Sequence, residues 1–132
     1  MKIAAVYSDF YPEISNGLLD GCRDVARNAK IKLKEFRVFG SLEIPLKIKQ
    51  LLNKDFDGFV ALGCIVKGQT LSNEIISYTI FDALMRLSLD FEVPIGVGVL
   101  SVKNLKQAKK RSSGRLNRGS EAMDAVLFSL KT

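Results

Sequence analysis

Lys67, Gly68 and Thr70 are the residues with the clearest chemical potential, because they directly follow a small, apolar run in "ALGCIVKGQT" (residues 61–70). Glycine lets the backbone turn tightly and approach a ligand. Amide groups at the start of a following helix attract negative groups, and a lysine and a threonine hydroxyl suit a phosphate. Alone, this short pattern also fits a loop with a helix cap.

Two more segments carry candidate ligand-binding side chains. "GSLEIP" (residues 40–45) places Glu43 at a helix start, where a carboxylate complements the helix dipole or contacts a ligand. "AKKRSSGRLNRGSEA" (residues 108–122) gathers basic residues around two glycines. Arginine binds phosphate through two parallel hydrogen bonds, so this segment is a phosphate clamp or a solvated loop.

Composition restricts the chemistry. The 132 residues include no histidine, which removes the commonest general base and metal ligand, and we expect no metal site. The net charge of +6 favours anionic partners. The basic residues are dispersed and lack interleaved aromatics, so a phosphate-type site is favoured over nucleic acid.

The remaining totals indicate a cytoplasmic protein. The N-terminus turns polar too early for a signal peptide, and no apolar run is long enough to cross a membrane. Cys22 and Cys64 lie far apart in the sequence without metal-ligand neighbours, as free core thiols do in a reducing compartment. The length fits a single domain over residues 1–132.

Strands and helices alternate along the chain. Short apolar runs predict strands at residues 3–7, 33–39, 59–64 and 94–100. Apolar residues at helical spacing predict helices near residues 12–29, 44–52, 75–91, 105–108 and 121–130. This alternation predicts an α/β fold with a parallel sheet and helices on both faces. Ligands bind past the carboxyl ends of such strands, which selects the loops "SDFYPE", "GSLEIP", "VKGQT" and "LSVKN".

Four segments together resemble lumazine synthase, an enzyme family of riboflavin biosynthesis. They are "FGSLEIP", "FVALGCIVKGQT", "VPIGVGVL" and "KQAKKRSSGRLNRGSEA", in the family's order and spacing. The resemblance covers nearly the whole chain. It implies a three-layer, flavodoxin-like sandwich around a four-stranded parallel sheet.

The resemblance implies a transferase. The family condenses 5-amino-6-ribitylamino-uracil with 3,4-dihydroxy-2-butanone 4-phosphate to give 6,7-dimethyl-8-ribityllumazine, phosphate and water, without a cofactor. It also implies pentamers whose active sites lie between neighbouring subunits, and riboflavin synthase as a candidate partner.

The resemblance also assigns the ring and ribityl contacts. Phe10 matches the aromatic that stacks on the pyrimidine ring. Ser41, Leu42 and Glu43 match the segment that contacts the ring and the ribityl chain, with the glutamate on ribityl hydroxyls. The ring pocket is lined by the strand end that matches Ile65, Val66 and Lys67.

The phosphate contacts follow from the same match. Gly68, Gln69 and Thr70 match the phosphate-binding turn. Arg111 matches the phosphate-binding arginine that a neighbouring subunit supplies, and Arg118 matches a lysine near the substrate ring.

Several residues depart from the family pattern around the site. Ser72 stands where the family usually has a histidine, the proposed proton shuttle. Residues 9–11 read "DFY" in place of "RFN", Leu42 replaces an aromatic, and Tyr78 and Thr79 replace an Asn-Glu pair. A serine of ordinary pKa is no base near neutral pH, so the catalytic position is degenerate.

Two functions of different class therefore stay open. One is a lumazine synthase slowed by the loss of the histidine at Ser72. The other is a non-catalytic pentameric scaffold or a flavin- or phosphate-binding protein. The survival of Phe10, Glu43, Thr70 and Arg111 favours the enzyme. An FMN-binding electron carrier fits poorly, because "SDFYPE" offers one serine and a proline after the first strand.

Assembly follows from the resemblance too. Members that form large shells usually carry an N-terminal segment that adds a strand to a neighbour's sheet. The first predicted strand here starts at Ile3, so we expect a pentamer or a decamer of two pentamers.

Overall fold

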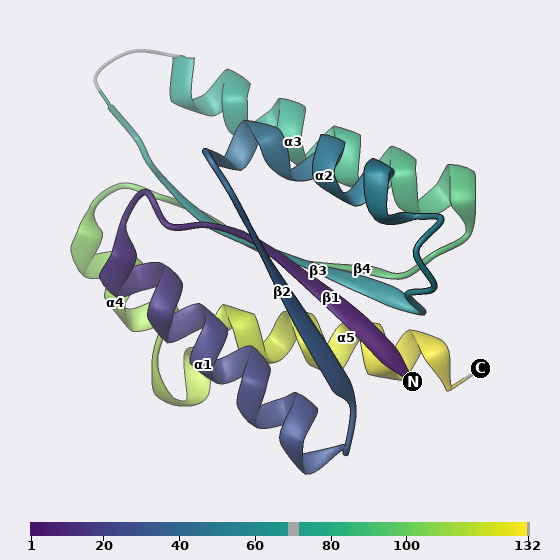
Figure 1. Cartoon of the computed structure of the whole chain (residues 1–132). Helices are drawn as coiled ribbons and strands as arrows, with labels where there is room; N and C mark the ends of the chain where they lie inside the picture. Colours follow the sequence, from purple (N-terminus) through teal and green to yellow (C-terminus); the bar gives the residue numbers. More distant parts are fainter. Residues whose placement is uncertain (69–71, 132) are drawn as a thin grey trace.

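The computed structural model describes residues 1–68 and 72–131 of the chain, in which a parallel sheet lies between two layers of helices (Figure 1). The order of the four strands is β2-β1-β3-β4. All three neighbouring strand pairs are parallel. The strands are β1 (Lys2–Ser8), β2 (Lys32–Val38), β3 (Gly58–Val66) and β4 (Ile95–Val102). This order is the flavodoxin-like one and confirms the predicted fold class.

Helices cover both faces of the sheet (Figure 1). The α-helices are α1 (Pro12–Asn28), α2 (Ile44–Leu51), α3 (Ser72–Phe91), α4 (Leu105–Arg111) and α5 (Arg118–Leu130). Two short 3₁₀ helices, η1 (Ser41–Glu43) and η2 (Gly114–Leu116), precede α2 and α5. The predicted elements are therefore present, although β3 runs on to Val66 and α5 begins already at Arg118.

Each face of the sheet has its own apolar core. On one side, α1 and α5 contribute Leu18, Cys22 and Met123. On the other side, α2 and α3 contribute residues such as Ile48 and Leu84. The central strand β3 is apolar on both faces, as a strand covered on both sides must be.

The parallel strands bring the predicted loops to one edge of the sheet. The turns after β1 and β2 lead into α1 and η1, whereas β3 ends beside the start of α3. Pro12 occupies the first turn of α1, where its missing N–H has no helical partner to lose.

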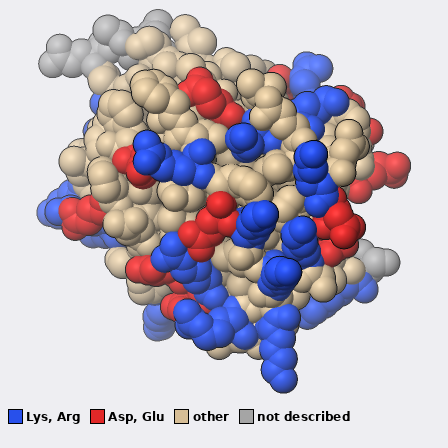
Figure 2. All heavy atoms as spheres, viewed as in Figure 1, with Lys and Arg blue, Asp and Glu red and all other residues tan. Residues whose placement is uncertain are grey.

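Charged side chains of both signs share the surface (Figure 2). On the face shown, Lys and Arg are interspersed with Asp and Glu. Some of these form ion pairs, for example Arg23 with Glu35 at 2.6 Å and Arg37 with Asp9 at 3.5 Å. In the part of the chain that the structure describes, no helix combines the length and the apolar character needed to span a bilayer.

Candidate active site

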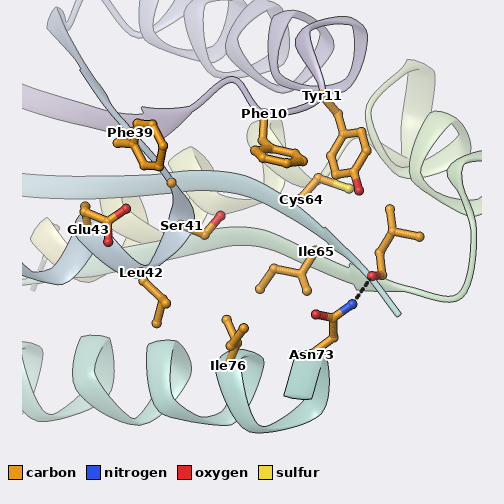
Figure 3. A pocket seen from close by; sticks show the side chains of 12 residues that line it. Phe10, Tyr11, Phe39, Ser41, Leu42, Glu43, Cys64, Ile65, Asn73 and Ile76 are labelled. Carbon is orange, nitrogen blue, oxygen red and sulfur yellow. Dashed lines mark hydrogen bonds between the residues drawn. The ribbon is translucent and has the colours of Figure 1, made fainter. Parts of the chain in front are cut away.

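A cavity of about 360 Å³ opens where β1, β2 and β3 end (Figure 3). Its walls come from the turns after β1 and β2, the last residues of β3 and the first turns of α3. The lining residues are Phe10, Tyr11, Phe39, Gly40, Ser41, Leu42, Glu43, Cys64, Ile65, Val66, Asn73 and Ile76. The walls are mostly apolar with a few polar groups, which is typical of a site for a small ring compound.

Six predicted ring and ribityl contacts meet in this cavity. The six are Phe10, Ser41, Leu42, Glu43, Ile65 and Val66. Phe10 is 71% exposed and packs edge to face on Tyr11, with ring centroids 5.2 Å apart. An aromatic face left open at a cavity is available for stacking on a planar ligand.

Gly63 explains how Ser41 reaches the cavity. A Cβ at residue 63 would lie 2.6 Å from Ser41 Oγ, which is closer than real contacts allow. The missing side chain therefore lets η1 lie directly on β3. Glu43 folds back near Gly40, so the serine hydroxyl and the carboxylate border the same end of the cavity.

Lys67 does not line this cavity. Its backbone N–H donates to Val102 O at 2.7 Å, and its ammonium group pairs with Glu74 at 3.3 Å. Of the three residues predicted together as ring contacts, Ile65 and Val66 therefore line the cavity and Lys67 does not. The pair is largely exposed, so its charge lies at the rim of the site.

The predicted phosphate turn is described only at its first residue. Among the described residues, a Cβ at Gly68 would meet Asn73 Nδ2 at an ordinary 3.5 Å, and the φ of Gly68 is outside the left-handed region. The described residues around Gly68 therefore leave room for a side chain, in contrast to those around Gly63. Gln69 and Thr70 lie outside the described residues.

Arg111 and Arg118 lie in a second cavity of about 390 Å³, beside the end of β4. Ser101, Gln107 and Lys110 also line it. Among the described residues, none lines both cavities. The predicted phosphate-clamp arginine is thus apart from Phe10 and Glu43 within one chain.

Two asparagine caps hold these arginines in place. Asn104 accepts a hydrogen bond from Gln107 N at 2.9 Å and starts α4, which ends at Arg111. Asn117 accepts from Gly119 N at 2.8 Å and donates to Gly17 O at 2.8 Å, which joins the start of α5 to α1.

Ser72 is exposed at the start of α3 and is not among the cavity residues. The next residue, Asn73, lines the cavity instead. The polar side chain that faces the cavity at the start of α3 is therefore the amide of Asn73, and not the hydroxyl of Ser72.

Some cavity residues were not assigned a role from the sequence: Tyr11, Phe39, Cys64, Asn73 and Ile76. All five lie within, or a few residues from, the quoted motifs, and this proximity in the sequence was the only indication that they line the site. Phe39, 87% exposed, is the aromatic nearest in the sequence to the substituted position Leu42.

Cys64 borders the cavity with a thiol whose burial disfavours the reactive thiolate. Burial raises the pKa of its thiol to about 11, so it stays protonated at neutral pH. Within the described residues, no group of three or more Cys, Asp or Glu side chains is placed to hold a metal ion.

Comparison with known proteins identifies related sequences along the entire chain. The family model described as 6,7-dimethyl-8-ribityllumazine synthase matches residues 1–132. A protein of that name from Corynebacterium glutamicum (strain R) is 36% identical over 130 residues, covering 96% of this chain and 81% of the relative. One from Tropheryma whipplei (strain Twist) is 38% identical over 127 residues, with the same coverage. One from Bartonella bacilliformis is 39% identical over 127 residues, covering 92% and 83%.

Proposed function

Because the chain belongs to the 6,7-dimethyl-8-ribityllumazine synthase family, we propose that it condenses 5-amino-6-ribitylamino-uracil with 3,4-dihydroxy-2-butanone 4-phosphate in riboflavin biosynthesis. The products are 6,7-dimethyl-8-ribityllumazine, phosphate and water. The observation that carries this proposal is the cavity that unites Phe10, Ser41 and Glu43 with the end of β3.

The cavity suits the ribitylamino-uracil. The open face of Phe10 stacks on the flat pyrimidine ring, and Ile65 and Val66 form an apolar wall around it. At the other end, the Ser41 hydroxyl and the Glu43 carboxylate hydrogen-bond to the ribityl hydroxyls. Substrate binding thus combines stacking with a few oriented polar contacts.

The ketone phosphate needs a cation, and none of the described residues that line this cavity is a lysine or an arginine. Lys67, at the rim, pairs with Glu74. We propose that Arg111 of a neighbouring copy supplies it, with Arg118 near the ring. The two arginines border a separate cavity at the β4 side of the sheet. Joining one copy's first cavity to the next copy's second cavity is a heterologous contact, the kind of contact that forms a ring when the rotation between copies closes.

Exposed apolar residues on α3 support such an assembly. Ile75, Tyr78, Met85 and Leu89 lie at helical spacing on α3, and all four are more than half exposed. A stripe of this kind on a helix already packed on its sheet indicates a protein contact. We propose a pentamer or a decamer. Light scattering tests this, and a mass equal to that of one chain would contradict it.

Catalysis in this site relies on proximity. General acid–base catalysis contributes about 10²–10⁴-fold, whereas holding two reactants together supplies more. Because Ser72 replaces the family histidine, we expect slow turnover rather than none. The amine of one substrate attacks the carbonyl of the other, so no covalent bond to the enzyme is required.

We propose a cytoplasmic location on the basis of the thiols. Cys22 and Cys64 are both free and buried. Free cysteines are typical of a reducing compartment.

The decisive experiment mixes the purified protein with both substrates and follows lumazine formation by absorbance and fluorescence. The proposal predicts a rate above the uncatalysed background that grows with protein concentration. A rate equal to the background would refute the enzyme and favour the scaffold. In that case, binding of the ribitylamino-uracil without turnover would identify a retained pocket.

A further inference from the structure

Phe10 is an exposed ring in the short turn between β1 and α1, although stacking on a ligand requires a fixed orientation. An exposed side chain on a turn moves between rotamers unless a neighbour holds it. Ordering such a side chain only when the ligand arrives would reduce the affinity. A neighbour that fixes the Phe10 ring beforehand would therefore strengthen binding.

Tyr11 is in contact with the Phe10 ring. The two ring centroids are 5.2 Å apart and the ring planes meet at 68°, an edge-to-face geometry that aromatic pairs favour. Both side chains lie at the same wall of the cavity (Figure 3). The pair therefore has the geometry by which one ring holds another.

Tyr11 itself is anchored on two sides. Its half-buried side chain packs against the apolar core that α1 and α5 form on the sheet. Its backbone carbonyl begins α1, where it accepts hydrogen bonds from the N–H groups of Ile14 and Ser15, each at 3.0 Å. The Ser15 hydroxyl also donates to this carbonyl, at 3.3 Å. An anchored ring thus lies against an exposed one.

We propose that Tyr11 is a positioning residue that holds the Phe10 ring in the orientation that stacks on the ribitylamino-uracil; this rests on the proposed function. The contact joins the two rings, so the role belongs to the aromatic ring of Tyr11 and not to its hydroxyl. The family pattern has asparagine at this position, so the role is a property of this chain and not of the resemblance.

The test is a double-variant cycle with 5-amino-6-ribitylamino-uracil as the ligand. Calorimetry measures its dissociation constant for wild type, Tyr11→Phe and Tyr11→Leu, each with and without Phe10→Ala. We expect Tyr11→Leu to weaken binding roughly two- to tenfold, because it removes the ring contact. Tyr11→Phe, which keeps the ring, should bind like wild type. In the Phe10→Ala background, Tyr11→Leu should make no further difference.

Phe56→Leu is the matched control. It removes another edge-to-face contact, with Phe36, whose ring centroid lies 5.8 Å from that of Phe56. Phe56 precedes β3, whereas the cavity lies where β3 ends. This variant should bind the ligand like wild type.

A second measurement uses no ligand. NMR relaxation reports the motion of the Phe10 ring on the picosecond to nanosecond timescale, with its signals assigned by their loss in Phe10→Ala. The ring should be ordered in wild type and more mobile in Tyr11→Leu. The wild-type measurement requires no change at Tyr11, so it decides even if Tyr11→Leu misfolds.

Any of four results would overturn the inference. They are a mobile Phe10 ring in wild type, no loss of affinity in Tyr11→Leu, the same loss in Tyr11→Phe, and a loss that persists in the Phe10→Ala background. The last would mean that Tyr11 does not act through Phe10. Failure of wild type to bind the ligand while its Phe10 ring is ordered would instead refute the proposed function.

Discussion

The replacement Gly63→Ala tests how the sheet positions the ribityl end of the cavity. The added methyl group would lie 2.6 Å from Ser41 Oγ, 3.6 Å from Ser41 Cβ and 3.7 Å from Ile44 Cδ1. Only the first contact is too short. The Ser41 hydroxyl must therefore turn away, whereas the backbone of η1 can stay in place.

The expected effects are modest and separable. Forcing a side chain off its preferred rotamer costs about 0.5–1.5 kcal/mol, so the free energy of unfolding should fall by about 1 kcal/mol. Losing one neutral hydrogen bond to a ribityl hydroxyl should raise the KM for the ribitylamino-uracil roughly two- to tenfold. The KM for the ketone phosphate should not change.

The double variant Gly63→Ala/Ser41→Ala provides the control. Removing Oγ leaves only the ordinary contacts, so in the Ser41→Ala background the added methyl group should no longer destabilise the protein. Urea denaturation at one fixed protein concentration measures this difference. Equal destabilisation in both backgrounds would refute the reasoning, because the strain would then lie elsewhere.

Three further predictions concern the phosphate, the proton path and pH. Arg111→Ala should weaken binding of inorganic phosphate roughly tenfold or more, since a charged hydrogen bond contributes about 1.5–3 kcal/mol; calorimetry with Lys106→Ala as the control checks this, and unchanged affinity would assign the clamp to another residue. Ser72→His should raise the rate of lumazine formation at saturating substrates roughly tenfold or more; no gain would mean that proton transfer is not limiting. Glu35→Gln should lower the melting temperature at neutral pH, because the Arg23 hydrogen bond holds the pKa of Glu35 below its ordinary 4.5. That stabilisation is present above the ordinary pKa and is lost as pH falls through the lowered pKa. The difference in melting temperature between wild type and Glu35→Gln should therefore shrink as the pH falls below 4.5, and a difference that stays constant in acid would contradict it.

The fold was predictable because its signals are local. The continuous apolar run of β3 and the regular alternation of strands and helices indicate a parallel sheet covered on both faces. The flavodoxin-like arrangement, in contrast, was implied only by the family resemblance. Helix α3 was harder, because apolar residues cover two of its faces. Ile75 and Phe91 belong to the helically spaced apolar residues from which this helix was predicted, but both are exposed. Periodicity detects an apolar face without indicating what covers it.

The candidate site was predictable in its motifs and less so in its geometry. Ser41 and Glu43 could be predicted as cavity residues because both belong to the short segment that follows the end of β2. Lys67 directly follows β3, yet its side chain pairs with Glu74 instead of lining the cavity, and sequence spacing does not predict that pairing. The sequence did not identify Asn73 as a cavity residue, because only the structure shows which of the adjacent side chains Ser72 and Asn73 faces the cavity.

Complementation between two variants tests the central claim, a single active site built from two copies of the chain. Glu43→Ala damages the first cavity and Arg111→Ala the second, so each variant alone should be nearly inactive. Unfolded together in equal amounts and refolded, random neighbours should restore about a quarter of the wild-type rate of lumazine formation, because one site in four would pair two intact halves. The Glu43→Ala/Arg111→Ala double variant, refolded with wild type in the same way, gives the reference for dilution. If the refolded mixture is no faster than the mean of the two separate variants, the site is not shared between copies. Glu43 and Arg111 would then act within the same subunit.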